Sequence, residues 1–91
     1  MIDVRTAVQA ALDYVQTFSK IFPTADPRLE ETDYDDQMGE WLITLSFADP
    51  TTGGALAGLA GPMNRSVKIF RVSAADGSVK SMKSRPLYPR T

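Results

Sequence analysis

The sequence predicts an α+β domain in which one N-terminal helix packs on a four-stranded antiparallel sheet. Three observations lead to this fold class. Apolar residues recur at helical spacing from Asp3 to Phe22, and large apolar side chains alternate with smaller ones from Glu40 to Phe47. Further along, the pair Asp76-Gly77 separates two strand-like segments. The order α-β-β-β-β is expected to bury the helix stripe against one face of the sheet.

The predicted helix runs from Asp3 to Phe22. Its apolar stripe consists of Val4, Val8, Ala11, Leu12, Val15, Phe18 and Phe22. Asp3 stands just before the stripe and is a suitable N-cap, while Pro23 cannot continue a helix. A membrane-surface helix would need more basic residues than Arg5 and Lys20. We therefore predict that the stripe packs on the sheet.

The stretch from Glu40 to Phe47 predicts the central strand. One face carries Trp41, Ile43, Leu45 and Phe47, and the other carries Leu42, Thr44 and Ser46. A slip of one residue would place the indole and the phenyl ring in water, so the register should be well fixed. The large apolar face is expected to pack on Val8, Leu12, Val15 and Phe18 of the helix.

The strand before the central one is less regular. It is predicted at Arg28 to Tyr34, where Leu29 falls on one face while Thr32 falls on the other. This pattern indicates a bulge or a short edge strand. Residues Asp35 to Gly39 then form the turn into the central strand, and Gly39 can adopt a positive φ there.

Two strands are predicted after the central one, at Ser66 to Ser73 and at Ser78 to Lys83. In the first of them Val67 and Ile69 share one face, and Phe70 and Val72 share the other. A flat register cannot bury both pairs, so we expect a bulge near Ile69, or a helix or partner that covers the second face. Val79 and Met82 break the alternation in the same way in the last strand.

Composition limits the chemistry of the protein. The 91 residues correspond to one domain, at 1–84, with an extended tail at 85–91. There is no cysteine and no histidine, which excludes thiolate chemistry and the commonest general acid–base. We predict a protein that is not an enzyme and needs no cofactor, although a Ser–Lys or paired-carboxylate site is left open. No apolar run is long enough to span a bilayer, and the first residues do not resemble a signal peptide. We expect a cytoplasmic protein without a membrane partner.

Charge is segregated along the chain. Residues 26–40 hold seven acids against Arg28 alone, and residues 65–90 hold seven bases against Asp76 alone. Opposite charges on facing strands stabilise their register. They can also create a dipolar surface that steers a charged partner or pairs two protomers. We predict that the two segments pair within the sheet or across a dimer. A nucleic acid partner is not expected, because it would require a denser basic stripe with exposed aromatic residues.

Three aspartates near the first turn suggest a metal site at first sight. Asp33, Asp35 and Asp36 supply the oxygen ligands that calcium and magnesium prefer. A calcium loop that begins at Asp33 would require glycine in place of Met38 and glutamate in place of Thr44. We predict a solvated turn and no metal.

The connection from Ala48 to Arg65 is unusually long. It holds four of the six glycines, yet it lacks the Gly-Lys-Ser/Thr of a phosphate loop. Long loops in small domains are usually either functional or disordered. This one carries three apolar residues, and the predicted partner-binding residues are Leu56, Leu59, Met63 and Arg65. The rival interpretation is that the loop folds over the sheet and buries Phe70.

A family resemblance covers most of the chain. Trp41-x-Ile43, followed by Phe70-x-Val72-Ser-Ala-Ala-Asp-Gly77-x-Val79, resembles PepSY-type domains of the cystatin-like class. Those domains show a tryptophan-led strand and an aromatic-x-valine-aspartate strand that enters a Thr-Gly turn. Here Ser73 stands where the aspartate is usual and Asp76 where the threonine is usual. The Gln-x-Val-x-Gly hairpin with which true cystatins enter a protease cleft is absent, so inhibition by that route is not expected.

The resemblance implies a non-catalytic, protein-binding or peptidase-regulating module. We therefore expect an interaction or inhibitory domain that binds a protein partner such as a peptidase or a toxin. Two alternatives stay open: a structural homodimerisation domain, and a binder of small ligands on the concave face of the sheet.

Overall fold

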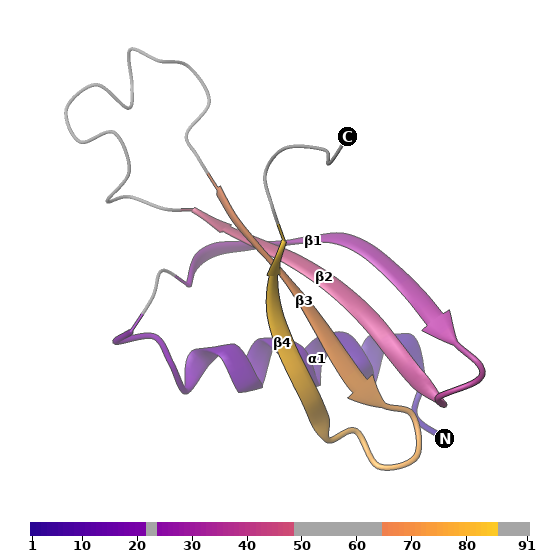
Figure 1. Ribbon diagram of the computed structural model, residues 1–91. Helices are drawn as coiled ribbons and strands as arrows, with labels where there is room; N and C mark the ends of the chain where they lie inside the picture. Colours follow the sequence, from indigo (N-terminus) through magenta and orange to yellow (C-terminus); the bar gives the residue numbers. More distant parts are fainter. Residues whose placement is uncertain (22–23, 49–64, 86–91) are drawn as a thin grey trace, which may run out of the picture.

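A computed structural model describes residues 1–21, 24–48 and 65–85 of the chain (Figure 1). In chain order the elements are α1 (Val4–Gln16), β1 (Ala25–Asp35), β2 (Glu40–Ala48), β3 (Arg65–Ser73) and β4 (Val79–Arg85). The four strands form one antiparallel sheet in the order β1-β2-β3-β4. This arrangement confirms the predicted α+β fold class. Within these residues, no helix is both long enough and apolar enough to cross a membrane.

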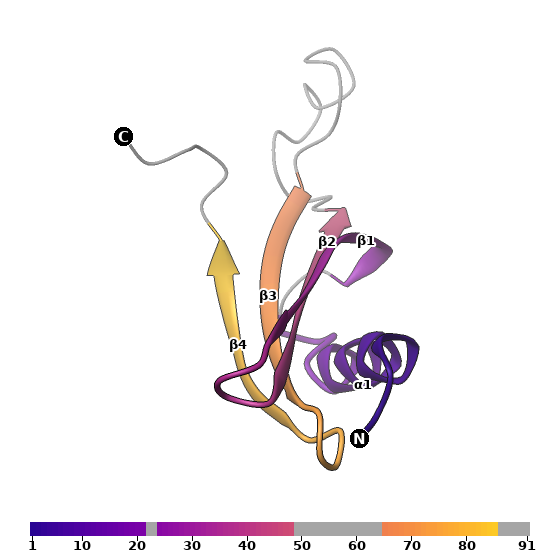
Figure 2. The ribbon, with the colours of Figure 1, turned by 90° about the vertical axis from the view of Figure 1, so that its right-hand side faces the viewer.

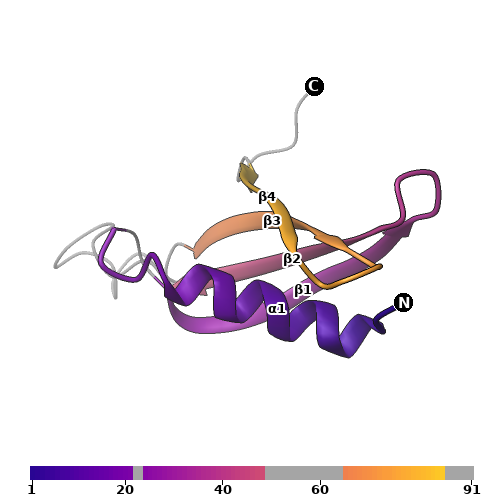
Figure 3. The ribbon, with the colours of Figure 1, turned by 90° about the horizontal axis from the view of Figure 1, so that it is seen from below.

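The helix lies on one side of the sheet only. Figure 2 shows α1 beside the strands, and Figure 3 shows it running beneath them. We call the side that α1 covers the helix face and the opposite side the open face. The N-cap prediction is confirmed, because Asp3 Oδ1 accepts a hydrogen bond from Thr6 N at 2.8 Å.

The helix ends at Gln16, earlier than the predicted end at Phe22. Thr17 Oγ1 donates to the carbonyl oxygen of Tyr14 at 2.7 Å, and Phe18 N donates to the carbonyl oxygen of Val15. These tighter bonds close the helix, since threonine, serine and aromatic residues favour the helix weakly and a threonine hydroxyl competes for backbone groups. The prediction of the far boundary was wrong; residues 22 and 23 themselves lie outside the described part.

The core lies between α1 and the middle of the sheet. Its fully buried members are Ala7, Ala11, Val15, Ile43, Leu45, Phe47, Phe70 and Val72. The predicted large apolar face of β2 is therefore confirmed, with Trp41 half-buried at its end. On the helix the innermost positions are small, whereas Val8 and Leu12 are only partly buried beside them. Alanines at these positions let the helix backbone approach the sheet closely.

The β1–β2 hairpin matches the prediction in its irregularity and in its turn. Register shifts occur between Ala25 and Arg28 and between Leu29 and Glu31, so the expected bulge is present. The strand is nevertheless long, at eleven residues, and forms one edge of the sheet. Gly39 adopts a φ of 67°, a conformation that glycine reaches without strain.

The bulge expected near Ile69 is not there. The β2–β3 register runs unbroken from Glu40 opposite Ser73 to Ala48 opposite Arg65. The irregularity lies instead between β3 and β4, where Lys80 is an extra residue. That bulge restores the alternation of β4, so that Val79 and Met82 both pack against the core.

The β3–β4 hairpin itself is confirmed. Gly77 has a φ of 79°, and Asp76 Oδ1 accepts from Ser78 N at 3.0 Å. Burial of Phe70 and Val72 under the helix leaves Val67 and Ile69 on the open face.

Candidate interaction surface

The open face is crossed at its centre by a row of four residues from four strands. Glu31 pairs with Thr44, Thr44 with Ile69, and Ile69 with Lys83. Thr44 and Ile69 are the middle residues of the nine-residue strands β2 and β3. We call these four residues the middle row. It has an acid at one edge of the sheet, an uncharged centre, and a base at the other edge.

Apolar side chains surround the centre of this row. Leu42 on β2 and Val67 and Ile69 on β3 are half-buried, although no described element lies over them. A depression of about 290 Å³ is lined by Glu31, Asp33, Leu42, Thr44 and Ile69. The centre of the open face is thus apolar and slightly hollow, with carboxylates along its β1 side.

One ion pair fixes two of the charged side chains beside this centre. Arg71 bonds to Glu40 Oε1 through both Nε and Nη2, each at 2.7 Å. Glu40 is largely buried, and Arg71 is about one-third exposed. This pair joins the acidic segment to the basic strands, as the charge distribution predicted. Both bonds reach the same carboxylate oxygen, and they hold the Arg71 guanidinium beside Leu42.

Arg65, one of the predicted partner-binding residues, lies at the end of the sheet from which the long connection leaves. Its Nε donates to Ser46 Oγ at 2.8 Å, and its Nη2 donates to the carbonyl oxygen of Ser46 at 3.0 Å. Its Nη1 lies 3.1 Å from Asp26 Oδ2, and Nη2 also donates to the Asp26 carbonyl oxygen. Ser46 Oγ in turn donates to Glu30 Oε2 at 2.6 Å. The guanidinium therefore ties β3 to β2 and to the start of β1.

The other predicted partner-binding residues, Leu56, Leu59 and Met63, lie outside the described residues. Their role stays a prediction from the sequence. The middle row was not among the predicted site residues. Alternation had placed Thr44 away from the large apolar face of the central strand. It had separated Ile69 from Phe70 without deciding which of the two faces the helix, and no local pattern showed that Glu31 and Lys83 end the same row.

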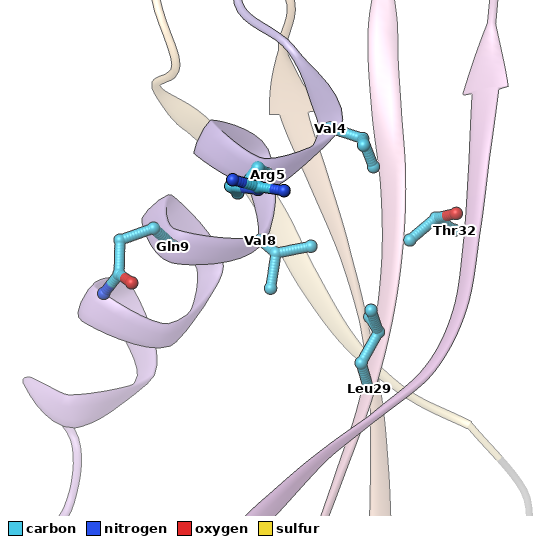
Figure 4. A pocket seen from close by; sticks show the side chains of 6 residues that line it. All are labelled: Val4, Arg5, Val8, Gln9, Leu29 and Thr32. Carbon is cyan, nitrogen blue, oxygen red and sulfur yellow. The ribbon is translucent and has the colours of Figure 1, made fainter.

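A second hollow lies on the helix face, between α1 and β1 (Figure 4). Its volume is about 390 Å³, and it is lined by Val4, Arg5, Val8, Gln9, Leu29 and Thr32. Leu29 is 52% exposed and Val4 36% exposed, so both present apolar surface to the solvent here. Figure 4 shows Val4 and Val8 of α1 on one wall and Leu29 and Thr32 of β1 on the other, with Arg5 and Gln9 on the helix farther from β1. We call this hollow the side groove.

Two aspartates at and near the β1–β2 turn accept hydrogen bonds from nearby backbone N–H groups. Asp33 Oδ1 accepts from Tyr34 N at 2.8 Å, and Asp35 Oδ1 accepts from Gln37 N and Met38 N at 3.1 and 3.2 Å. Among the residues that the structure describes, no three carboxylates gather closely enough to hold a metal ion. These side chains shape the hairpin that carries β1 and β2.

Comparison with protein-family models, with curated proteins and with solved structures found no match for this chain. The PepSY resemblance accordingly stays a prediction that rests on the short motifs in β2, β3 and the last hairpin.

Proposed function

We propose that this protein is a non-catalytic interaction module that binds a protein partner through the open face of its sheet. The observation that carries the proposal is the middle row. The apolar centre at Ile69 offers a partner contact area. Glu31 on one edge and Lys83 on the other offer opposite charges that can orient the partner. Interfaces commonly combine such an apolar centre with a charged rim.

The sheet edges are less suitable for binding a partner strand. β1 carries two register shifts, Pro27 and the neighbouring acids Glu30 and Glu31. β4 has seven residues, with the extra residue Lys80 and a second lysine at Lys83. Bulges, prolines and edge charges are the means by which proteins prevent strand addition. A partner is therefore expected to meet the face of the sheet and not its edges.

The PepSY resemblance implies a protein-binding or peptidase-regulating module, and the sequence also leaves a toxin partner and a homodimerisation domain open. A broad sheet face with a charge gradient suits recognition of another folded surface. It suits an active-site cleft less well, because a broad sheet face cannot enter a narrow cleft.

Photo-crosslinking tests the proposal. A benzophenone amino acid placed at Ile69 should form covalent adducts with a specific protein in the organism that encodes this chain. The same amino acid at Asp13, on the exposed side of α1, is the control. Adducts at Ile69 that are absent at Asp13 support the proposal. Equal labelling from both positions, or none from either, rejects it.

A second candidate function is the binding of a small aliphatic molecule in the side groove. It is favoured by the paired exposure of Leu29 and Val4, and Arg5 on the rim could pair with a carboxylate. Fluorescent fatty acid analogues would test it. Leu29→Glu should abolish binding, whereas Met38→Glu, which changes another exposed apolar residue outside the groove, should leave it intact.

A further inference from the structure

We infer that the partner of the open face is a second copy of this chain, packed face to face about a two-fold axis parallel to the strands. This inference rests on the proposed function and specifies its partner. The axis runs between β2 and β3, through the centre of the middle row. Glu31 of each copy then lies opposite Lys83 of the other.

The charges of the middle row favour this axis over its alternative. A two-fold axis parallel to the strands exchanges the two edges of the sheet, so β1 of one copy faces β4 of the other. A two-fold axis across the strands would instead place β1 on β1 and β4 on β4. It would bring Glu31 against Glu31 and Lys83 against Lys83, and like charges in direct opposition are unfavourable. Because the register places Glu31 and Lys83 in one row, the first axis aligns both opposite pairs at once.

The centre of the face also suits this packing. Under the same axis, Thr44 of one copy lies opposite Ile69 of the other, and the half-buried Leu42 and Val67 lie next to them. Two sheets that pack in this way stand about 10 Å apart with their strands roughly aligned. The Arg71–Glu40 pair neutralises its own charges and imposes no repulsion.

The size of the face is adequate for a dimer. Four strands about 4.8 Å apart and about 30 Å long span a flat area of roughly 600 Å². This is of the same order as the roughly 800 Å² that each partner contributes to a standard interface. Closed two-fold pairs are also the commonest form of self-association.

Charge reversal tests the inference. Sedimentation equilibrium of the purified protein should show a dimer that weakens as salt is added. Glu31→Lys and Lys83→Glu should each raise the dissociation constant of the dimer about tenfold or more, because each replaces two attractive pairs by two repulsive ones. A chain with both changes should regain the dimer. A mixture of the two single variants should form a heterodimer in preference to either homodimer.

The axis across the strands predicts a different result. There, like charges oppose like charges in the wild type and in each single variant, so a single reversal would leave the dimer unchanged. Matched controls are Asp13→Lys and Lys20→Glu, which make the same charge changes on the helix side of the chain. Thermal unfolding of every variant confirms that the exposed substitutions leave the domain folded. The inference is overturned if the wild type is monomeric at every concentration. It is also overturned if Glu31→Lys and Lys83→Glu raise the dissociation constant of the dimer no more than the controls do.

Photo-crosslinking from Ile69 separates this inference from the proposed function. An adduct with twice the mass of the chain, joined to a peptide that contains Thr44 or Ile69, supports the second copy. An adduct with a different protein retains the open face as a binding surface but overturns the second copy as its occupant. The absence of any adduct specific to Ile69 rejects both.

Discussion

The indole of Trp41 is tied to the start of the chain, because its Nε1 donates to the carbonyl oxygen of Ile2 at 3.1 Å. Ile2 N donates in turn to the carbonyl oxygen of Ala74, at 2.7 Å, in the β3–β4 turn. The ring of Tyr34 packs on the indole with the centroids 4.9 Å apart. Trp41 therefore joins β1, β2 and the residues that precede α1.

We predict that Trp41→Ala lowers the free energy of unfolding by about 3 kcal/mol, near the lower end for such truncations because the indole is only half-buried. Trp41→Phe should lower it by about 1 kcal/mol, since the ring stays while the bond to Ile2 is lost. Urea denaturation followed by circular dichroism measures both values. If Trp41→Ala unfolds at the wild-type midpoint, the indole does not join these elements.

Close approach of helix and sheet depends on Ala11. Its side chain is fully buried at the centre of the row formed by Ala7, Ala11 and Val15. Ala11→Leu should lower the free energy of unfolding by about 1–3 kcal/mol, because the added methylenes must displace the helix. The control is Gln16→Leu, at an exposed position of the same helix. If Ala11→Leu and Gln16→Leu have the same free energy of unfolding, the space between α1 and the sheet can accommodate a larger side chain than the packing of Ala11 indicates.

The sequence allowed prediction of the elements whose pattern is local. Alternation in β2 identified Ile43, Leu45 and Phe47 as core residues, because every second side chain of a strand that faces a helix on one side is buried and apolar. The cap at Asp3 and the turn at Gly77 depend on neighbouring residues in the same way. The end of the helix was harder, since a few weak helix formers decide it and their preferences differ by only tenths of a kcal/mol.

Long-range features were not predictable. The middle row depends on the bulge at Lys80, which shifts the β3–β4 register by one residue and places Lys83 opposite Ile69, and tertiary packing decides the position of that bulge. Ala7 was missed as a core residue because alanine carries little pattern. The hydrogen bonds of Arg65 were missed because Asp26, its partner, is 39 residues away in the chain.

The contacts of Arg65 can be tested against those of Arg28. Both arginines reach Asp26, but the Arg65 side chain is 17% exposed and that of Arg28 is 62% exposed. Arg65→Lys should lower the free energy of unfolding by about 1–3 kcal/mol, because a lysine cannot replace the fork that also satisfies the buried Ser46. Arg28→Lys should change it by less than about 0.5 kcal/mol, since exposed ion pairs contribute little. Equal losses in thermal unfolding would mean that the bonds to Ser46 contribute nothing.

Stability should also decline in acid, through the two aspartates that cap backbone turns. The hydrogen bond from Thr6 N lowers the pKa of Asp3 below its ordinary value of 3.8, and the hydrogen bond from Ser78 N lowers the pKa of Asp76 in the same way. A carboxyl with a lowered pKa in the folded state binds its proton more readily when the chain unfolds. The stabilisation is therefore complete above the unfolded pKa and is lost as the pH falls through the folded one.

Asparagine at both positions separates the charge from the cap. Asn keeps an oxygen that can accept the backbone hydrogen bond, but it does not titrate. The variant that combines Asp3→Asn with Asp76→Asn should be close to the wild type in stability at neutral pH, and its urea midpoint should fall less steeply as the pH is lowered below about 4. Urea titrations across that range measure the slope directly. An unchanged slope in the double variant would assign the acid sensitivity to other carboxylates and leave the two caps without an electrostatic role.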